Sequence, residues 1–559
     1  MDVNVRVAGE AGQGVQTTGE LLVNAFAGMG LHVFSTQVYM SRVRGGLNSF
    51  DVRAADRELF SARRSADLVV ALNGEARDAL KADVAPGGVL LFDGKADPPV
   101  VGINFTETAR QVSQSGLMAN TVAAGAVFSV LGYDVETLCD YLAVEFKKKG
   151  PEVVEKNVNC ARRGAELARE VAAPSVKAPV GGRPVGKVYS GSEAFALGAA
   201  TAGLKFVAAY PMTPSTPTFT YLAALADEYG IVVEQAEDEI SAVNMICGAT
   251  YAGVPALATT SGGGFALMVE GLSLAGMLEL PIVIMLAQRP APATGLPTRT
   301  GQEDLKFAIN AGHGDFARAV YAPGTIEEAY ALMRRSFETA HKYQTPAIIM
   351  SDQFLADVRK NVMPLDAASR PIDRCILENP PADYMRYAVT ESGVSPRAIP
   401  GGPAFVIVDS DEHMEDGHIT EDLEARVRLQ DKRLRKLAGM AAEAMPPAVY
   451  GPPDAAHLLV CWGSTYMPCR EAVDILAARG DSVAMVHFPQ VFPLNVKAAY
   501  AALSGPGAAR RRVTCIEGNA TAQFAMLLRQ YGVVGDCEHL LKYNGLAFTG
   551  EEIVGRILR

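Results

Sequence analysis

Short apolar runs alternate with longer segments of helical spacing in the middle of the chain. Such runs lie at residues 205–209, 255–260, 281–287 and 346–350. A continuous apolar run of this length, bounded by proline, glycine or polar residues, is typical of a strand buried on both faces. Strands that alternate with helices predict a parallel α/β sheet, which binds ligands at the carboxyl ends of its strands.

The same pattern continues toward both ends of the chain. Strands are expected at 3–8, 66–72 and 87–92, and again at 458–463, 482–488 and 512–517. Ser190 is placed to cap the helix that opens the middle block. Residues 355–445 are less regular, and their charged, helix-like tail at 421–438 is expected to pack on the rest or to contact a partner. The prediction is an α/β protein throughout.

Two breaks rich in proline and glycine, at 173–184 and 445–453, divide the chain. Stiff prolines and flexible glycines with little hydrophobic periodicity are typical of connections between domains. The predicted organisation is therefore a domain at 1–172, a linker at 173–188, a domain at 189–445 and a domain at 456–559. Domains of this size are ordinary for a chain of 559 residues.

Composition narrows the class of protein. Hydrophobic residues make up 49% and charged residues 20%, as in a core-forming globular chain. A net charge of −11 argues against a nucleic-acid partner. Residues 1–7 resemble a first strand more than a signal peptide, and no uncharged apolar run approaches the roughly 18 residues that span a bilayer. A cytoplasmic protein without a membrane segment is expected.

The cysteines and the acidic segments do not predict a metal site. None of the eight cysteines forms a CxxC pair, so they suit neither an iron–sulfur cluster nor zinc and are expected to be reduced core thiols. Residues 409–418 crowd acids with histidines, either as a metal site or as a solvated acidic loop. Because the spacing matches no known ligand set, the loop is favoured.

Four polar motifs lie at or after the predicted strands of the middle block. Residues 210–216 read Tyr-Pro-Met-Thr-Pro-Ser-Thr and form a strand-to-helix turn, where hydroxyl groups and free backbone N–H groups suit an anion. The other motifs are Glu239 at a helix start, the glycine turn 259–265, and the segment 288–300 that begins Gln-Arg-Pro. Three of the four follow a strand directly, which predicts a binding site at the carboxyl edge of the sheet.

Together these motifs resemble the α subunit of 2-oxoacid:ferredoxin oxidoreductases, most closely the 2-oxoglutarate type (2-oxoglutarate synthase). The resemblance spans nearly the whole chain. It implies a γ-type α/β domain at 1–172, a pyrimidine-type thiamine diphosphate domain with an extension at 189–445, and a transketolase C-terminal-like domain at 456–559. In the last domain, residues 517–519 (Glu-Gly-Asn) close a strand.

The resemblance also assigns roles. Glu239 would hydrogen-bond the aminopyrimidine ring of thiamine diphosphate; the alternative is a glutamate that caps or salt-bridges a helix start. Arg289 would bind the substrate carboxylate; the alternative is a pair with a structural aspartate. Catalytic residues are thus Glu239, Thr213 and Arg289. Thr213 and Thr298 would donate hydroxyl groups, Arg299 would meet a distal carboxylate, and Ser261, Gly262 and Gly263 would approach the cofactor, unless this turn is only a tight crossover.

The N-terminal glycines at positions 9, 12 and 14 depart from the GxGxxG order of a dinucleotide site. The resemblance instead connects this domain with coenzyme A. Gly12 and Gly14 are candidates for that site, and Arg42 and Arg44 are placed to meet its phosphates unless they are solvated or lie in an interface.

The sequence contains no Gly-Asp-Gly segment and no cluster-binding cysteines. The resemblance therefore implies a β subunit that holds Mg²⁺, the diphosphate and a [4Fe-4S] cluster, in an (αβ)₂ assembly that serves ferredoxin. The implied reaction is CoA-dependent oxidative decarboxylation of 2-oxoglutarate to succinyl-CoA and CO₂, in either direction. Pyruvate, a branched-chain or an aryl 2-oxoacid is the alternative substrate. A non-catalytic binding or scaffold subunit is the other alternative, which loss of Glu239 or Arg289 would have favoured.

Overall fold

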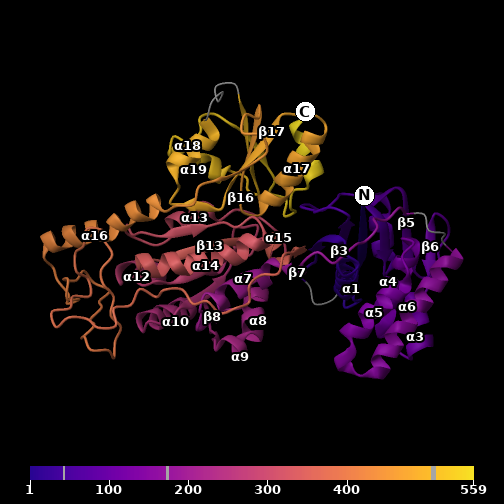
Figure 1. Cartoon of the computed structure of the whole chain (residues 1–559), viewed down its shortest axis with the longest axis horizontal. Coiled ribbons are helices and arrows are strands. Elements are labelled where there is room, and N and C mark those ends of the chain that lie inside the picture. The colour runs from indigo at the N-terminus through magenta and orange to yellow at the C-terminus, as the bar shows by residue number, and fades with distance from the viewer. Residues whose placement is uncertain (42–44, 172–175, 505–510, 559) are drawn as a thin grey trace. The chain divides into compact units, whose positions relative to one another are not determined.

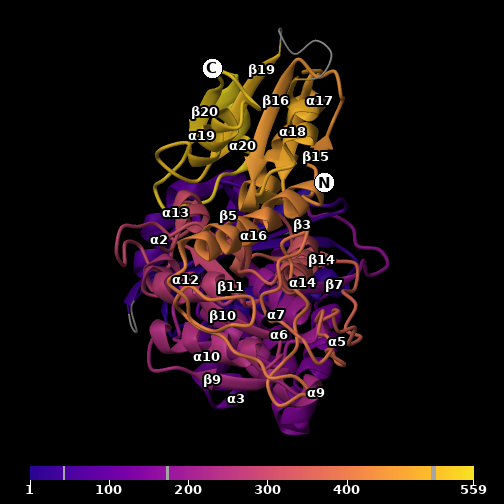
Figure 2. The ribbon, with the colours of Figure 1, turned by 90° about the vertical axis from the view of Figure 1, so that its left-hand side faces the viewer.

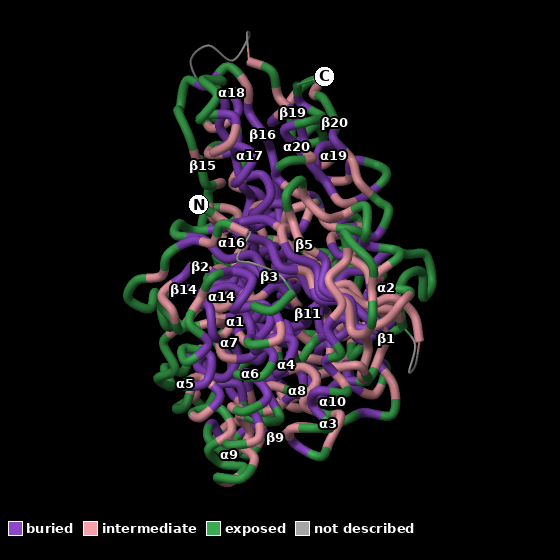
Figure 3. The backbone as a smooth tube through the Cα atoms, turned by 90° about the vertical axis from the view of Figure 1, so that its right-hand side faces the viewer, coloured by how far each residue is buried: buried purple, intermediate pink, exposed green. Residues whose placement is uncertain are grey.

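The computed structural model describes residues 1–41, 45–171, 176–504 and 511–558. Helices and strands alternate through most of them, which confirms the predicted α/β class (Figure 1). The chain divides into two units. Unit 1 contains Met1–Tyr189, Asp357–Pro364 and Thr549–Glu552, and unit 2 contains Ser190–Ala356, Leu365–Phe548 and Ile553–Arg559. Figure 3 shows the inner strands as buried chain, with exposed loops outside.

Unit 1 is built on an eight-stranded sheet of order β6-β5-β4-β1-β3-β2-β14-β7. The strands predicted at 3–8, 66–72 and 87–92 are present as β1, β4 and β5, and with β6 they pair in parallel. The next strands, β3 and β2, pair antiparallel, so this sheet is mixed where a parallel one was predicted. The strands are β1 (Asp2–Ala11), β2 (His32–Val38), β3 (Gly45–Ala55), β4 (Ala66–Ala71), β5 (Val84–Asp93), β6 (Val100–Ile103), β7 (Lys187–Ser190) and β14 (Arg359–Val362).

Helices cover this sheet and bury their apolar positions against it. One core joins alternate strand residues to α1, α3, α4, α5 and α6. The helices are α1 (Val15–Gly28), α2 (Gly74–Leu80), α3 (Phe105–Ser113), α4 (Ala119–Val130), α5 (Val135–Glu145) and α6 (Pro151–Val171). Strand β14, far along the chain, belongs here because the Asn361 side chain accepts a hydrogen bond from Val33 N (2.9 Å) and donates to Leu31 O (2.9 Å).

Unit 2 contains a seven-stranded sheet of order β18-β12-β13-β11-β10-β8-β9, parallel except for β18. All four strands predicted for the middle block are present within one or two residues. Its first helix begins at a capping box of Ser190 and Glu193, as the Ser190 prediction required. The strands are β8 (Phe206–Ala209), β9 (Val232–Gln235), β10 (Ala256–Thr260), β11 (Val283–Gln288), β12 (Ala319–Tyr321), β13 (Ala347–Asp352) and β18 (Gln490–Phe492).

Helices lie on both faces of this sheet, as buried parallel strands require. Alternate residues of β10, β11 and β13 pack with α10, α11 and α12, and α14 packs against α7 and β13. The helices are α7 (Gly191–Thr201), α8 (Thr216–Ala224), α9 (Ala226–Tyr229), α10 (Glu239–Tyr251), α11 (Gly262–Leu267), α12 (Val269–Met277), α13 (Leu305–Asn310), α14 (Ile326–Tyr343) and α15 (Gln353–Asp357).

The last part of unit 2 adds a five-stranded sheet of order β15-β17-β16-β19-β20 (Figure 2). Alternate residues of β16 face two cores: Leu458, Val460 and Trp462 pack with α18 and α19, and Leu459 and Cys461 with α17 and α20. Strand β15 falls inside the break at 445–453, which was predicted as a connection only. The elements are α17 (Tyr466–Ala478), α18 (Val496–Ser504), α19 (Gln523–Gln530), α20 (Gly550–Ile557), β15 (Ala448–Tyr450), β16 (His457–Trp462), β17 (Val483–Phe488), β19 (Arg512–Glu517) and β20 (Glu538–Leu541).

The irregular chain from Leu365 leads through loops to α16 (Leu423–Ala442), drawn in orange in Figure 1. Three cations of this segment and of α16 lie at the carboxyl ends of three helices that flank the seven-stranded sheet. Arg397 donates to Thr250 O at the end of α10 (3.4 Å), Arg386 to Glu279 O after α12 (3.0 Å), and Lys436 to Gln344 O after α14 (2.9 Å). These carbonyls carry the negative end of each helix dipole, so buried cations suit them.

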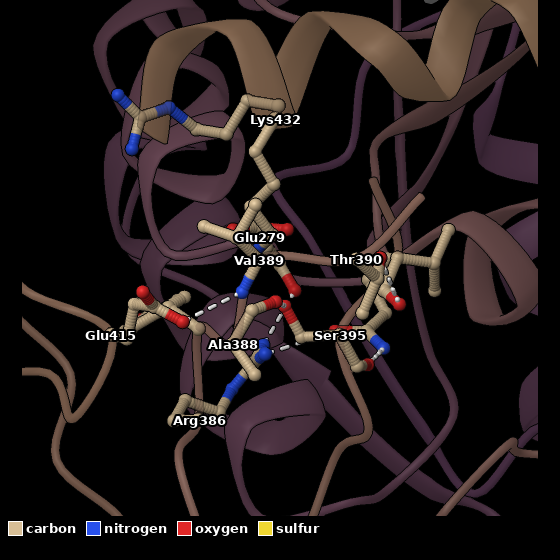
Figure 4. A network of polar contacts seen from close by, with 12 residues as sticks. Glu279, Arg386, Ala388, Val389, Thr390, Ser395, Glu415 and Lys432 are labelled. Atoms are coloured by element: carbon tan, nitrogen blue, oxygen red, sulfur yellow. Dashed lines mark hydrogen bonds and ion pairs between the residues drawn. The ribbon is translucent and has the colours of Figure 1, made fainter. Parts of the chain in front are cut away.

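Glu279 is the counter-charge within this cluster (Figure 4). Its carboxylate lies 2.6 Å from Lys432 Nζ and 2.5 Å from Lys436 Nζ, and all three side chains are buried. Burial alone would raise the pKa of Glu279, but Lys436, Lys432 and Arg386 together hold it well below its ordinary value. Burial lowers the pKa of Lys436 to about 8. The charged tail predicted at 421–438 therefore packs on the rest of the chain.

The acidic segment 409–418 is only partly solvated, which corrects its description as a solvated loop. His413 is buried against the Tyr387 ring, and the Glu412 carboxylate pairs with Arg433 (2.8 Å). Among the described residues, no group of three or more histidines, cysteines and acids is placed to hold a metal ion. In the same part of the chain, no helix combines the length and apolar character needed to cross a membrane. All eight cysteines are free thiols.

Candidate functional site

The candidate site lies at the carboxyl ends of β8, β10 and β11, which are neighbours in the seven-stranded sheet. Residues 210–216 follow β8, the glycine turn follows β10, and Arg289 follows β11. Glu239 begins the helix that comes after β9, the next strand along. The rule that parallel strands present their following loops at one edge thus brings the four predicted motifs together.

Glu239 is the first residue of α10 and is 3% exposed. The helix is capped by its neighbour Asp238, whose side chain accepts a hydrogen bond from Ser241 N at 2.7 Å. Among the described residues, Glu239 Oε1 has no hydrogen-bond partner. Since leaving a buried carboxylate oxygen unpaired costs about 1–3 kcal/mol or more, the alternative of Glu239 as a helix cap does not account for its burial.

The glycine turn presses against this carboxylate. A Cβ atom at Gly264 would lie 2.5 Å from Glu239 Oε1 and 2.3 Å from Thr260 Oγ1, so only glycine fits there. Ser261 is buried, and its Oγ has no hydrogen-bond partner among the described residues. Gly263 is exposed, and a Cβ added there would have only Ala293 O within 4 Å, at 4.0 Å. The glycines of the turn therefore let its backbone approach the Glu239 carboxylate closely.

Arg289 is 8% exposed and directs part of its guanidinium to the first motif. Its Nη1 donates to Thr213 O at 2.7 Å, while its Nε has no partner among the described residues. Burial lowers the pKa of Arg289, although the nearby Asp304 opposes this. Thr213 thus contacts Arg289 through its carbonyl group, a contact that the sequence did not predict; Thr298 is also buried.

Asp304 is a member of the site that the sequence analysis missed. It is 7% exposed, its Oδ2 has no partner among the described residues, and a Cβ at Gly262 would lie 2.6 Å from that oxygen. Burial and then Glu303 raise the pKa of Asp304 from 3.8 to about 6, while Arg289 opposes the rise. An acid directly before an apolar helix is typical of an N-cap, so the sequence held no signal for this role.

Gln302 fixes the loop that carries these residues to the five-stranded sheet. Its backbone N–H donates to Gly518 O, its Oε1 accepts from Gly518 N and its Nε2 donates to Trp462 O, each at 2.8 Å. Glu517 ends β19 as predicted and is fully buried, accepting from Trp462 Nε1 at 3.2 Å. Arg299 is half-buried against Gly545 of the same C-terminal part.

The candidates for coenzyme A lie in unit 1. Gly12 and Gly14 form the turn between β1 and α1 and have φ angles of 91° and 78°. A Cβ at Gly14 would meet the Asn120 side chain at 2.2 Å, whereas the space around Gly12 is open. Arg42 and Arg44 lie outside the described residues. The turn was correctly expected, but its part in binding remains a prediction.

The site fits the thiamine cofactor implied by the sequence resemblance. A glutamate that accepts from, or shares a proton with, a ring nitrogen needs a dry carboxylate with a free oxygen, and Glu239 Oε1 is such an atom. Gly264 packs directly against this carboxylate, where any side chain would collide with it. An anionic substrate needs an arginine with free N–H groups, which Arg289 Nε supplies.

Comparison with known proteins supports the family that the sequence motifs resemble. The family described as "Pyruvate flavodoxin/ferredoxin oxidoreductase, thiamine diP-bdg" matches residues 197–432, and "Pyruvate ferredoxin/flavodoxin oxidoreductase" matches residues 4–167. The α subunit of 2-oxoacid:ferredoxin oxidoreductase 2 from Aeropyrum pernix is 30% identical, over 100% of this chain and 98% of the relative. The 2-oxoglutarate oxidoreductase subunit KorA from Mycobacterium tuberculosis is 28% identical over 100% of this chain and 91% of the relative.

One solved structure is similar over the whole length. It is the 2-oxoglutarate:ferredoxin oxidoreductase from Magnetococcus marinus with 2-oxoglutarate, coenzyme A and succinyl-CoA bound, at 32% identity. The TM-score is 0.92, with 100% of this chain and 99% of the other covered. The chain therefore belongs to the 2-oxoacid:ferredoxin oxidoreductase family, as an α-type subunit.

Proposed function

We propose that the chain is the α subunit of a CoA-dependent 2-oxoglutarate:ferredoxin oxidoreductase. It would convert 2-oxoglutarate to succinyl-CoA and CO₂ and pass the electrons to ferredoxin, in either direction. The name of the Mycobacterium tuberculosis relative and the ligands named for the Magnetococcus marinus structure support 2-oxoglutarate as the substrate.

The observation that carries the proposal is a pair of buried polar atoms at one edge of the seven-stranded sheet, Glu239 Oε1 and Arg289 Nε, neither of which has a partner among the described residues. Leaving each of them unpaired destabilises the fold by about 1–3 kcal/mol. A ligand that offers a donor to the glutamate and an acceptor to the arginine would recover this energy. An aminopyrimidine and a 2-oxoacid carboxylate together have these properties.

Each residue then has one task. Thiamine diphosphate, when bound, supplies the carbon nucleophile for the ketone of the 2-oxoacid. Glu239 would hydrogen-bond the pyrimidine ring nitrogen and share a proton with it, and Ser261, Gly262 and Gly263 would contact the cofactor. Arg289 orients the substrate carboxylate through its planar fork, which a lysine could not match. We assign hydroxyl contacts to Thr213 and Thr298, and the distal carboxylate of 2-oxoglutarate to Arg299.

The proposal includes a β subunit that covers this edge of the sheet. The elements that form the site expose large apolar side chains to solvent, as surfaces that bind partners often do. We assign Mg²⁺, the diphosphate and a [4Fe-4S] cluster to that subunit, in an (αβ)₂ complex that reduces ferredoxin in the cytoplasm. The exposed side chains are Tyr210, Ile240, Met245, Leu267 and Leu296.

The proposal also keeps the predicted domains. Residues 1–172 form the γ-type domain that serves coenzyme A, with Gly12, Gly14, Arg42 and Arg44 as candidate contacts. Residues 173–188 link it to the thiamine domain at 189–445, and residues 456–559 form the transketolase C-terminal-like domain. Limited proteolysis that releases a folded fragment ending near residue 172 would support the first boundary.

The direct test uses the chain purified with the partner that it retains. Turnover of 2-oxoglutarate is compared with that of pyruvate, with CoA and a low-potential dye, and thiamine and iron are quantified. A preference for 2-oxoglutarate, with thiamine and iron that depend on the smaller chain, supports the proposal. A preference for pyruvate changes the substrate but keeps the family chemistry. A chain with no partner, thiamine or turnover indicates the scaffold alternative.

A further inference from the structure

Arg289 and Asp304 carry opposite charges and lie near each other in the site, but they form no ion pair with one another among the described residues. Arg289 Nε and Asp304 Oδ2 are both unpartnered among the described residues, although each influences the pKa of the other. Gln288 fixes the backbone of Asp304, because its Oε1 accepts from Asp304 N at 3.1 Å while its Nε2 donates to Ser351 O at 3.2 Å; Arg289 is held by its bond to Thr213 O at 2.7 Å. Each residue is therefore held by its own hydrogen bond, and no hydrogen bond or ion pair joins the two side chains among the described residues.

Asp304 has no helix-capping bond that would explain its burial. It occupies the N-cap position of α13, yet its side chain accepts no capping hydrogen bond there. Its carboxyl group instead lies against Gly262, at a position where a side chain would collide with Oδ2. The free oxygen thus faces the glycine turn that lines the candidate site.

The charges predict what a bound carboxylate does to this residue. The charged groups that act on Asp304 are Glu303 from the same loop and Arg289 from the end of β11. A substrate carboxylate at Arg289 would place a second anion beside Asp304 in a dry environment. Because like charges and desolvation both favour the neutral acid, this raises the pKa of Asp304 beyond its ligand-free value of about 6.

Resting on the proposed function, we propose that Asp304 takes up one proton from solvent when the 2-oxoacid carboxylate binds to Arg289, and that its carboxyl group then donates a hydrogen bond to that carboxylate. The site thereby binds a carboxylic anion together with a proton. Asp304 becomes a residue that contacts substrate and sets its preference for a carboxylate over an ester or amide.

Calorimetry on the complete complex counts the protons directly. Glutarate is the probe because it has both carboxylates of 2-oxoglutarate and no ketone to react. At pH 7.5, the binding enthalpy is compared in two buffers that differ in ionisation enthalpy. Uptake approaching one proton per site is expected for the wild-type complex and close to none for Asp304→Asn. Equal uptake in both complexes would overturn the proposal.

The pH dependence of KM for 2-oxoglutarate tests the same step without relying on glutarate. Above about pH 6, a binding step that takes up one proton raises KM by up to about tenfold per pH unit. Asp304→Asn should flatten this rise. Glu303→Gln removes one of the charges that raise the pKa of Asp304, so the rise should begin at lower pH. It keeps an oxygen for the hydrogen bond from Ala291 N.

Controls separate the possible failures. Asp315→Asn, at an exposed position, should keep the wild-type profile. If Asp304→Asn does not assemble, the Glu303→Gln profile decides, and an unshifted profile counts against the proposal. Absence of 2-oxoglutarate turnover in the wild-type complex rejects the proposed function. Normal turnover with a KM profile that Asp304→Asn leaves unchanged rejects only the role of Asp304.

Discussion

The two ends of the seven-stranded sheet both bury charged groups but differ in the counter-charges that they place beside the buried acids. At the amino end, Lys436, Arg386 and Arg397 donate to carbonyls at or just after the ends of three helices, and Glu279 pairs with Lys432 and Lys436. At the carboxyl end, Glu239 Oε1, Arg289 Nε and Asp304 Oδ2 have neither a hydrogen bond nor an ion pair among the described residues. At the amino end Arg397 Nε and Glu279 Oε2 also lack a hydrogen bond, but Glu279 Oε2 has Lys436 Nζ at 2.5 Å as its counter-charge. Satisfied charges hold a fold together, whereas unsatisfied ones are available to a ligand.

The two buried acids at these ends show the difference most clearly. Glu279 lies among cations that hold its pKa below the ordinary value, so it stays charged. Burial and Glu303 raise the pKa of Asp304 to about 6, because only Arg289 acts in the other direction. The first acid contributes stability near neutral pH, and the second costs stability there.

Glu239→Gln should have the largest effect, and it should be on turnover. Glutamine keeps the size but cannot share a proton with the ring nitrogen, so a loss of about 10²- to 10⁴-fold in kcat is expected. The unfolding temperature should not fall. Glu270→Gln, at an exposed acid in the first turn of α12, is the matched control and should keep full turnover. Near-normal turnover of Glu239→Gln would remove it from the mechanism.

Glu279→Gln, at the amino end of the sheet, should lower stability and leave turnover unchanged. It leaves two lysines buried without their carboxylate, which should cost about 3–5 kcal/mol in the free energy of unfolding. Turnover per folded complex should stay near wild type, because the site lies at the other end of the sheet. Glu415→Gln can still accept from Val389 N and serves as the control in chemical denaturation. A loss of turnover without a loss of stability would contradict the assignment of Glu279 to stability and of the carboxyl end to catalysis.

Arg289→Lys should have an intermediate effect. The ammonium group keeps the charge but loses the planar fork, so the apparent KM for the 2-oxoacid should rise about 10- to 100-fold. Steady-state kinetics on the complex with full thiamine content measures this. An unchanged KM would refute the assignment of the substrate carboxylate to Arg289.

Asp304→Asn should have the smallest effect, and it should increase the free energy of unfolding where most substitutions decrease it. The folded state holds a proton up to about pH 6, whereas the unfolded carboxyl releases it near 3.8. Stability due to this group therefore falls as pH rises between these values. The variant should be more stable than wild type by about 1–2 kcal/mol at pH 8, with a smaller gain at pH 5. Destabilisation at pH 8 in thermal unfolding would show that Asp304 has a structural partner.

Much of the carboxyl end was predictable from the sequence. Strands β8, β10, β11 and β13 are apolar runs bounded by clear breaks, and the edge rule for parallel sheets then gathers the motifs that follow them. Asp304 was not predicted as a site residue, because an acid directly before a helix is usually explained as an N-cap. The strand-to-helix turn at Gly12 and Gly14 was also found, whereas the antiparallel strands β2 and β3 were not.

The amino end was much less predictable. The charged, helix-like tail at 421–438 was expected to pack on the rest or to contact a partner, but nothing in its pattern identified Glu279, about 150 residues away in sequence, as the partner of Lys432 and Lys436. Only the fold shows that helix ends meet there. Strand β14 likewise joins unit 1 through Asn361, which no local pattern reveals.

The three hydrogen bonds of Gln302 have a consequence for protein engineering. They tie the loop that follows Arg289 to Gly518 and Trp462 in the five-stranded sheet. A chimera that exchanges only the C-terminal segment with a relative would therefore separate this loop from the surface that shapes it. Exchanges meant to transfer substrate choice should move residues 288–304 together with 456–548, as one cassette.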